Sequence, residues 1–456
     1  MGTLYQAPQE LTIQDLKVAI QDSTLLFPSQ QTQDDQNKSI FLSNIDQVLN
    51  FHVQTLHFFR ANPDFPPESV ASRLKNALEK LMVAPNYDFL AGRLKLNHET
   101  GRLEIECNGS GVGFVVATTE YSLDEIGDFV YPNPGFMQLI VPGLEKFEDQ
   151  PLDVFQVTSF KCGGFALGVS TNHVLFDGMS FKIFLENLAS QAFDDKPLSI
   201  VPCNDRRLLA ARSPPQVTFP HPELLKLKPL IGEEVAPPVF DCKQDDLDFK
   251  IFNLNPNDIN HLKEKTKSGT TKSTTKITGF NVITAHIWRC KALSCDDDEN
   301  RDRESMVLYA VDIRQRLNPP LPVSYCGNAV LSAYATAKCS ELEDEPFAKV
   351  VDMVAEGAGR MTNEYARSAI DWGEVYKGFP NGEFLISSWW RLGFDEVVYP
   401  WGKAMYSCPL VYHRKDIILL FPEVGGPAGN NGVNVLVALP TKEMDKFQTL
   451  FHKYLA

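Results

Sequence analysis

A chain of 456 residues, 43% of them hydrophobic, is long enough to form two or three domains with sizeable cores. Its formal net charge of −15 excludes a general affinity for nucleic acid or anionic membranes, which requires a basic face. The nine cysteines are odd in number and dispersed, which excludes a disulfide framework and is typical of reduced thiols.

The N-terminus carries no basic segment followed by an apolar block, so it does not look like a signal peptide. No stretch approaches the roughly 18 consecutive apolar residues that a membrane-spanning helix needs. These features predict an acidic, cytoplasmic globular protein without a membrane span.

In chain order, residues 1–60 alternate as predicted strands around polar turns. Pro66 and Pro67 then open a clear amphipathic helix. Its apolar side chains recur at helical spacing, namely Val70, Leu74, Ala77, Leu78 and Leu81. Short alternating segments follow at 90–120 and 152–172 and are predicted to be strands.

A histidine and an aspartate then bracket an apolar triplet at 173–177. Large and small residues alternate through 165–173, which predicts a half-buried strand, and 179–193 has apolar residues at helical spacing. The order is therefore strand, turn, helix, with the imidazole of His173 at the exit of the strand. Neutral imidazole is a natural general base for a hydroxyl or amine nucleophile.

This motif alone has structural interpretations as well. His173 could be a satisfied core histidine, and Asp177 could be the N-cap of the helix that starts at Gly178. Asp177 could also orient His173 as the acid of a catalytic triad does, or it could point away and fix the turn through an arginine. The spacing does not decide between these alternatives.

From about 196 to 240 prolines recur and periodicity is lost, which predicts a long crossover linker between two domains. Beyond it, strands and helices interleave as in α/β or α+β layers. The predicted strands are 248–254, 306–312, 417–422 and 433–439, and the predicted helices are near 257–268, 279–294, 346–360 and 441–454.

Three further groups of residues could serve a ligand. Arg314 and Arg316 share a strand parity before a proline-rich stretch, which indicates a clamp for a buried carboxylate. Lysines gather at 263–276, either as a solvated loop or as a docking place for a phosphorylated ligand such as coenzyme A. Trp389, Trp390 and Trp401 lie close together, either as core or as a source of an indole donor to an oxyanion.

Several other chemistries find no support in the sequence. It contains no G-x-G-x-x-G, no Walker loop, no G-x-S-x-G elbow, no H-E-x-x-H and no acidic metal cluster. We therefore expect no metal site.

Four segments, in family order, resemble the plant BAHD acyl-CoA-dependent acyltransferases, and the likeness runs nearly end to end. They are the H-x-x-x-D-G hallmark at 173–178, an L-S-x-x-D stretch at 42–46, an A-H-x-W-R helix within 284–290 and a V-D-x-R-x-R…Y-F-G-N segment at 311–328. Taken together, they favour His173 as a catalytic base over a core histidine.

The second hallmark of this family, D-F-G-W-G, is altered here. The similar stretch begins at Val398, which replaces the acidic residue. In the family this aspartate is thought to pair with an arginine of the segment that resembles 314–316. An unpaired buried guanidinium is costly, so we expect a substitute partner, for which Asp312, Asp395 and Asp177 are candidates.

The resemblance implies a chloramphenicol-acetyltransferase-like α/β fold with two similar-sized mixed-sheet domains. The N-terminal domain, with the H-x-x-x-D motif, is expected at 1–195, the crossover linker at 196–240 and the C-terminal domain at 241–456. A solvent channel would run between the domains, with His173 midway along it.

The resemblance also implies the site. The catalytic residues would be His173 as base, Asp177 as the anchor of its loop and Trp389 as the donor to the oxyanion. Acyl-CoA would enter from the face of the lysine cluster, and Ser387 would line the reaction chamber beside Trp389. The expected coenzyme-A contacts are Lys267, Lys272, Ser387, Trp401 and Gly402.

The implied function is transfer of an acyl group (aromatic or hydroxycinnamoyl, acetyl or fatty) from coenzyme A to the hydroxyl or amine of a plant specialised metabolite. Acyl-CoA would be a co-substrate, with no permanently bound cofactor, and the protein would be a monomer. One alternative is a non-catalytic BAHD-like scaffold in lipid or cuticle metabolism. Another is a small-molecule binding protein.

Overall fold

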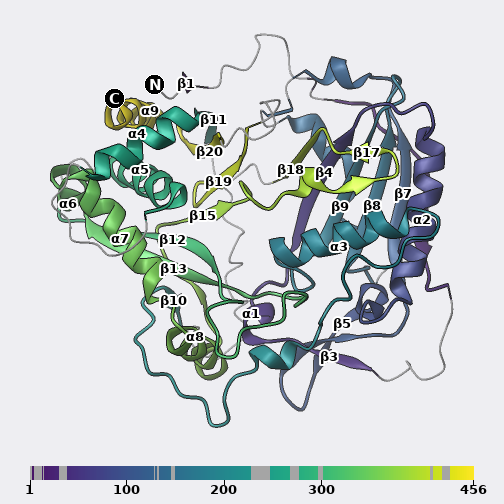
Figure 1. Cartoon of the computed structure of the whole chain (residues 1–456), viewed down its shortest axis with the longest axis horizontal. Helices are drawn as coiled ribbons and strands as arrows, with labels where there is room; N and C mark the ends of the chain where they lie inside the picture. The colour runs from purple at the N-terminus through teal and green to yellow at the C-terminus, as the bar shows by residue number, and fades with distance from the viewer. Residues whose placement is uncertain are drawn as a thin grey trace, which may run out of the picture.

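The computed structural model consists of two lobes, each built on a mixed β-sheet with helices packed against it (Figure 1). This arrangement confirms the predicted α/β class. The structure describes residues 3–4, 13, 15–29, 38–127, 129–130, 133–144, 149–226, 247–267, 277–295, 301–410, 414–423 and 432–456.

The sheet of the N-terminal lobe has six strands in the order β18-β4-β9-β8-β7-β2. Its strands are β2 (Ala19–Leu26), β4 (His52–Phe59), β7 (Val112–Thr118), β8 (Asp153–Ser159), β9 (Phe165–Asn172) and β18 (Tyr406–Pro409). Strand β9 pairs with β4 on one side and β8 on the other. The end of β9, which precedes His173, is therefore held from both sides.

Helices α2 (Pro67–Met82) and α3 (Gly178–Gln191) share one core with this sheet. Both helices confirm predictions from sequence periodicity. In α2, Leu74, Leu78 and Leu81 are almost completely buried, and burial of each such side chain contributes about 1.5–3 kcal/mol. These two helices fix the direction in which the chain leaves β9.

Strand β9 was predicted to be half-buried, but all eight of its residues are buried. The face that carries the small residues is covered by a short 3-10 helix, η4 (Pro134–Leu139). A Cβ atom on Gly168 would lie 2.2 Å from the carbonyl oxygen of Leu139, so only glycine fits there. The alternation of large and small residues therefore marks two covered faces.

A small three-stranded sheet and a single-turn helix lie beside this lobe. The strands are β3 (Ser39–Phe41), β6 (Arg102–Glu106) and β5 (Arg93–Asn97). Helix α1 (Asn44–Gln47) lies in a region predicted to consist of strands. It begins with a capping box between Ser43 and Asp46.

The sheet of the C-terminal lobe has seven strands in the order β1-β11-β20-β19-β15-β12-β13. Its strands are β1 (Thr3–Leu4), β11 (Leu247–Leu254), β12 (Glu304–Asp312), β13 (Val330–Lys338), β15 (Phe384–Ser388), β19 (Ile417–Pro422) and β20 (Val433–Pro440). The four strands predicted for this half are all present; β13 and β15 were not predicted.

Six helices belong to the described part of the C-terminal half. They are α4 (Pro256–Lys267), α5 (Gly279–Ser294), α6 (Cys339–Asp344), α7 (Phe347–Arg360), α8 (Asn363–Tyr376) and α9 (Thr441–Leu455). Four of them, α4, α5, α7 and α9, confirm predicted helices and share one core with the sheet. Helices α6 and α8 were not predicted.

Strands are exchanged between the two halves of the chain. Strand β18 comes from the C-terminal half and pairs with β4, whereas β1 comes from the N-terminus and pairs with β11. The predicted linker contains a 3-10 helix, η5 (Arg206–Leu209), and β10 (Leu224–Leu225), which pairs with β14 (Phe379–Pro380); residues 227–240 lie outside the described residues. The domain boundaries 1–195, 196–240 and 241–456 stay a prediction.

Within the described residues, none of the helices combines the length and apolar character needed to cross a bilayer.

Candidate active site

His173 directly follows β9 and begins the turn that leads into α3. Its N–H donates to the carbonyl of Phe51 at 2.8 Å, and its own carbonyl accepts from the side-chain amide of Asn328 at 2.8 Å. The half-buried imidazole lies 5.3 Å from the ring of Phe51, and its buried Nδ1 makes no hydrogen bond of good geometry within the described residues. The backbone of His173 is therefore fixed by hydrogen bonds that do not involve its ring.

The electrostatic setting of His173 favours a neutral ring. Burial lowers the pKa of His173 below its ordinary value because it penalises the imidazolium; its own carbonyl, Asp177 and Asn328 act in the opposite direction but more weakly. At neutral pH the side chain is therefore an unprotonated imidazole, which is the form that can accept a proton.

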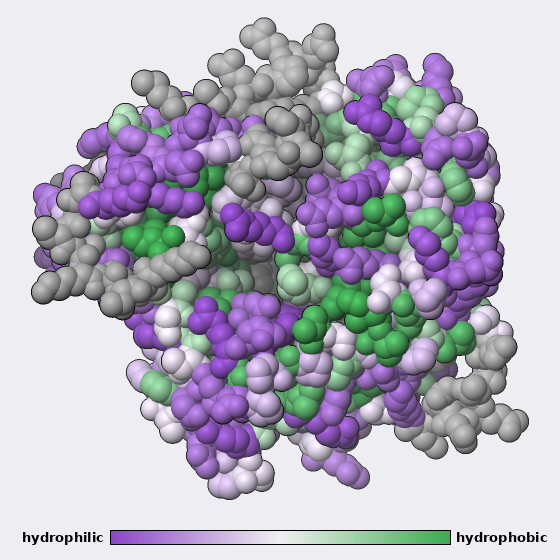
Figure 2. Space-filling view, in the orientation of Figure 1, coloured by the Kyte–Doolittle hydropathy of each residue, from purple (hydrophilic) through white to green (hydrophobic). Residues whose placement is uncertain are grey.

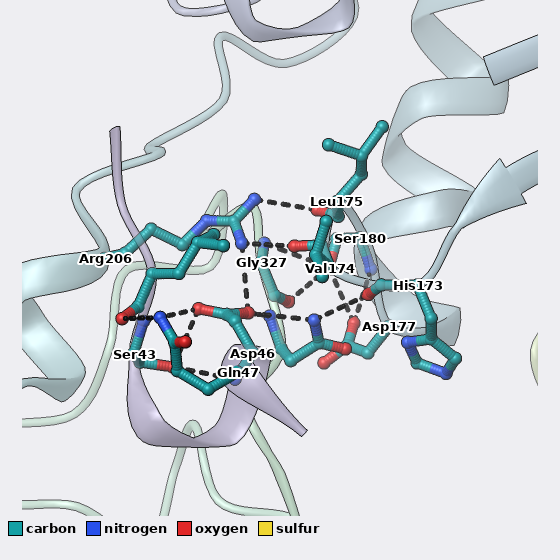
Figure 3. Close-up of polar contacts among 12 residues, drawn as sticks. Ser43, Asp46, Gln47, His173, Val174, Leu175, Asp177, Ser180, Arg206 and Gly327 are labelled. Carbon is teal, nitrogen blue, oxygen red and sulfur yellow. Dashed lines mark hydrogen bonds and ion pairs between the residues drawn. The ribbon is translucent and has the colours of Figure 1, made fainter. Parts of the chain in front are cut away.

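Asp177 caps helix α3. Its Oδ1 accepts from the N–H and the hydroxyl of Ser180 at 2.9 and 2.6 Å, and its Oδ2 accepts from the N–H of Ala329 at 3.0 Å. Figure 3 shows the imidazole of His173 pointing away from this carboxylate. Of the alternatives left open by the sequence, the N-cap is confirmed, and Asp177 acts on the turn instead of on the ring of His173.

Asp177 also forms a two-pronged ion pair with Arg314, whose Nη1 and Nη2 approach its two oxygens at 2.8 and 2.9 Å. Burial alone would raise the pKa of Asp177, but the charge and hydrogen bonds of Arg314 lower it below its ordinary value. Arg314 also approaches Asp312 at 3.2 Å. Two of the three expected substitute partners are thus found; Asp395 forms no ion pair with Arg314 in the described part of the chain.

The two arginines of the predicted clamp separate. Strand β12 ends at Asp312, so the predicted shared strand parity of Arg314 and Arg316 is wrong: both follow the strand in a turn. Arg316 donates to the carbonyls of Ala358 and Met361 at 2.7 and 3.2 Å, which fastens this turn to the end of α7. Only Arg314 reaches the 173–178 turn.

A second buried ion pair braces the turn from its other side and was not predicted. Arg206 donates to Asp46 at 3.0 Å and to the carbonyls of Val174 and Leu175 at 2.5 and 2.9 Å (Figure 3). The side chains of Arg206 and Asp46 are completely buried. Arg206 falls in the predicted linker, where no sequence signal marks it; Asp46 belongs to the L-S-x-x-D stretch but was assigned no role.

Ser387 and Trp389 lie in and just after strand β15, and Trp389 reaches the junction of the lobes. Ser387 is half-buried in β15, in register with Leu419 of β19. The half-buried indole of Trp389 lies edge-on to Phe394, with centroids 5.4 Å apart, and packs against the cores of both lobes. Figure 2 shows the surface hollowed between the lobes. The roles of Ser387 and Trp389 toward a substrate stay predictions.

Trp401 is a core residue of the N-terminal lobe. It is 5% exposed, and its indole packs against Tyr399, Phe165 and Phe59 at centroid distances of 5.1, 6.0 and 6.3 Å. Its burial disfavours a direct contact between the indole and coenzyme A. Gly402 is half-buried in the short hairpin of β16 (Val398–Tyr399) and β17 (Gly402–Lys403), and its predicted contact is untested.

Val398, which was predicted to stand where the second hallmark has its carboxylate, is 55% exposed on the same hairpin. Asp177 and Asp312 carry the pairing of Arg314 without any acid at this position. The altered hallmark therefore leaves no buried guanidinium without a counter-charge in the turn.

The predicted lysine cluster is only partly described. Lys267 is exposed at the end of α4 and pairs with Glu264 at 2.5 Å, whereas Lys272 lies outside the described residues. Lys265 donates to the carbonyls of Tyr454 and Leu455 at 2.9 and 3.3 Å, so it supports the C-terminus. Lys267 is the described member whose charge faces solvent most openly.

The family of the chain follows from its sequence as a whole. A family model described as the Transferase family matches residues 16–453. The chain belongs to this family, the BAHD acyltransferases. The resemblance stated from its motifs is thereby confirmed, as is its assignment to the acyltransferases.

Several relatives of this BAHD acyltransferase match over nearly their whole length. Acyltransferase GLAUCE of Arabidopsis thaliana is 59% identical, with 100% of both chains covered. Omega-hydroxypalmitate O-feruloyl transferase of the same plant is 32% identical, covering 96% of this chain and 93% of its own. Shikimate O-hydroxycinnamoyltransferase of Nicotiana tabacum is 31% identical, covering 96% and 100%.

Two solved structures resemble the BAHD acyltransferase in fold. Vinorine synthase superposes with a TM-score of 0.72 at 23% identity and covers 94% of this chain and 96% of its own. TRI101 of F. sporotrichioides, complexed with coenzyme A and T-2, gives a TM-score of 0.70 at 16% identity, covering 89% and 96%. At these identities the likeness concerns the fold alone, and it confirms the predicted pair of mixed-sheet domains.

Proposed function

We propose that the protein transfers an acyl group from coenzyme A to a hydroxyl or amine, with His173 as the general base. The observation that carries this proposal is the turn at 173–178. It fixes the backbone of His173, and among the described residues the Nδ1 of the neutral ring has no hydrogen bond of good geometry. A base must be unprotonated and free to accept a proton from its substrate.

The proposed step balances without a covalent enzyme intermediate. The acceptor's proton passes to His173 as its oxygen or nitrogen bonds to the thioester carbonyl carbon. The tetrahedral intermediate then collapses, the carbon–sulfur bond breaks and the coenzyme-A thiolate takes the proton from His173. Trp389 is proposed as the donor to the oxyanion, and Ser387 as a contact to the acyl group or the acceptor.

In this proposal Asp177 serves catalysis through the turn. Its ion pair with Arg314 and its cap on α3 hold the residue that follows β9 in one orientation. Lys267, Lys272 and Gly402 are proposed to lie beside coenzyme A, and the lysines would meet its phosphates. The protein is proposed to act as a cytoplasmic monomer.

The donor is proposed to be a hydroxycinnamoyl-CoA before any other acyl-CoA. Three relatives over 30% identical carry feruloyl or hydroxycinnamoyl transfer in their names, and a fourth is called a fatty alcohol:caffeoyl-CoA acyltransferase. Fatty alcohols and ω-hydroxy acids are the acceptors to test first, followed by amines.

The test is a matrix of acyl-CoAs (acetyl, benzoyl, caffeoyl, feruloyl, palmitoyl) against alcohols and amines, read by release of the coenzyme-A thiol. Wild type and His173→Ala are measured side by side. We expect turnover with at least one hydroxycinnamoyl donor and its loss in His173→Ala. A wild type silent across the matrix would overturn the proposal and leave the scaffold; ligand binding without thiol release would leave the binding protein.

A further inference from the structure

Three consecutive carbonyl groups of the 173–178 turn are held by one buried network. The carbonyl of His173 accepts from the side-chain amide of Asn328 at 2.8 Å. The carbonyls of Val174 and Leu175 accept from Nη1 and Nη2 of Arg206. The first half of the turn is therefore fixed through its backbone, whereas Arg314 fixes its second half through Asp177.

Both donors of this network converge on one carboxylate. Asp46 Oδ1 accepts from Arg206 at 3.0 Å, from the side-chain amide of Asn328 at 2.9 Å and from its backbone N–H at 3.2 Å. Asp46 Oδ2 accepts from the N–H and hydroxyl of Ser43 at 2.9 and 2.7 Å. Asp46 is thus fully coordinated, and it orients the two side chains that grip the turn.

The surrounding backbone is shaped to admit Arg206. Gly327 has a φ of +148°, and a Cβ atom there would lie 2.8 Å from Nε of Arg206. The charge of Asp46 keeps the pKa of the buried Arg206 above its ordinary value, despite the opposing effect of burial. Arg206 is therefore a charged guanidinium for which the backbone at Gly327 leaves just enough room.

We propose that Arg206, anchored by Asp46, is a positioning residue for His173. Its planar guanidinium reaches Asp46 and two successive carbonyls at once, so it sets the path of the turn that carries the imidazole. Burial of an ion pair is weak evidence for a gain in stability, but fork geometry is well suited to fixing an orientation. The inference rests on the proposed function, because it assigns His173 the role of base.

Two variants separate the effect of the two-armed guanidinium of Arg206 from the effect of the charge that anchors it. Arg206→Lys keeps a cation beside Asp46, but its single ammonium does not reproduce the two-armed contact with Val174 and Leu175. Asp46→Asn keeps the shape and removes the anchoring charge. We expect each folded variant to lose roughly 10–100-fold in kcat, with KM for donor and acceptor changed less than about threefold.

Arg93→Lys is the matched control. Arg93 is also a buried arginine that donates to three carbonyls, those of Gly92, Ser110 and Gly111, and pairs with Asp149. None of these contacts involves the 173–178 turn. Arg93→Lys is therefore expected to lower the melting temperature without changing kcat by more than about twofold.

A second measurement does not depend on turnover. Diethyl pyrocarbonate modifies neutral histidines, and the rate at His173 can be followed by mass spectrometry of its peptide, with the exposed His98 as internal reference. A loosened turn exposes the ring, so Arg206→Lys should raise the rate at His173 by at least about threefold relative to His98. The control Arg93→Lys should leave this ratio unchanged.

The outcomes distinguish the two proposals. A wild type silent in acyl transfer refutes the proposed function, while the modification rate still decides the inference about Arg206. A folded Arg206→Lys or Asp46→Asn with wild-type kcat and a wild-type rate at His173 overturns the positioning role. If neither variant folds, the ion pair is a folding element, and the positioning role is likewise overturned.

Discussion

His221 and His173 are both held in tight turns, yet their surroundings are opposite. The Nδ1 of His221 lies 2.9 Å from Glu223, and its Nε2 lies 2.8 Å from the hydroxyl of Ser368. These are the partners and distances of a serine–histidine–acid triad. The ring of His173, by contrast, has no hydrogen bond of good geometry at Nδ1 within the described residues, and it lies tilted against the ring of Phe51.

This difference supports His173, and not His221, as the proposed base. Ser368 is completely buried, and its hydroxyl also accepts from the N–H groups of Thr218 and Phe219, so no substrate can reach it. Both ring nitrogens of His221 have hydrogen-bond partners, and these contacts hold a loop against α8. At His173 the backbone N–H and carbonyl have hydrogen-bond partners, whereas Nδ1 of the ring has none of good geometry within the described residues. The triad-like distances around His221 therefore belong to a structural hydrogen-bond network that holds a loop, and not to a catalytic site.

Removal of the ring of His173 tests its proposed role as the base. His173→Ala should lower kcat by about 10²–10⁴-fold, because that is the usual contribution of a general base. Its melting temperature should stay within a few degrees of wild type, since the backbone carries the contacts of this residue. Turnover by the variant at wild-type rates with the donor found in the matrix would refute the base.

Removal of the ring of His221 should give the reverse result. His221→Ala removes one hydrogen bond from each of the buried side chains of Glu223 and Ser368, and a lost buried hydrogen bond costs about 0.5–1.5 kcal/mol. Thermal unfolding should show this loss, with kcat of the folded variant unchanged. Ser368→Ala removes the hydroxyl that contacts His221 and should likewise lower the melting temperature without changing kcat. A large fall in kcat in either variant would show that the contacts of His221 influence the active site.

The pH dependence of kcat/KM gives a further test of His173 as the base. Burial lowers the pKa of His173 below its ordinary 6.5, so the unprotonated base persists as the pH falls and is lost only when the pH passes through the lowered pKa. The acid limb should therefore have its midpoint below pH 6.5. Because kcat/KM reports the free enzyme, a midpoint at or above that value would mean that a group other than His173 is the base.

Long periodic segments made most of the fold predictable. Helices α2 and α5 have buried residues on every turn, and their predicted ranges match the structure closely. Helix α8 was missed because acidic residues, Ser368 and Gly373 interrupt its apolar pattern; its buried Asp371 and Trp372 gain their places only from tertiary contacts. The four-residue α1 is too short for any periodic signal.

The site was predictable only where one local pattern carries it. The cap by Asp177 was among the alternatives that the local spacing left open, because a helix cap is set within one turn. The role of His173 as base came from the family resemblance and stays a prediction. The importance of Arg206 arises from the convergence of Asp46, Val174 and Asn328, which are far apart in the sequence. Nothing near Arg206 in the sequence distinguishes it from the other arginines of the chain.

Lys267, at the edge of the proposed site, is expected to have only a small effect on KM for acyl-CoA. Lys267→Ala should raise KM for acyl-CoA by about two- to fivefold without changing kcat, because an exposed lysine attracts phosphate through a solvent-screened charge. Lys349→Ala is the control, since Lys349 is also exposed and paired with a nearby glutamate, Glu345, at 2.6 Å. Only the Lys267 effect should fade as salt is raised toward roughly 1 M. An equal rise in KM for both variants would assign the effect to the overall charge of the protein and remove Lys267 from the coenzyme-A contacts.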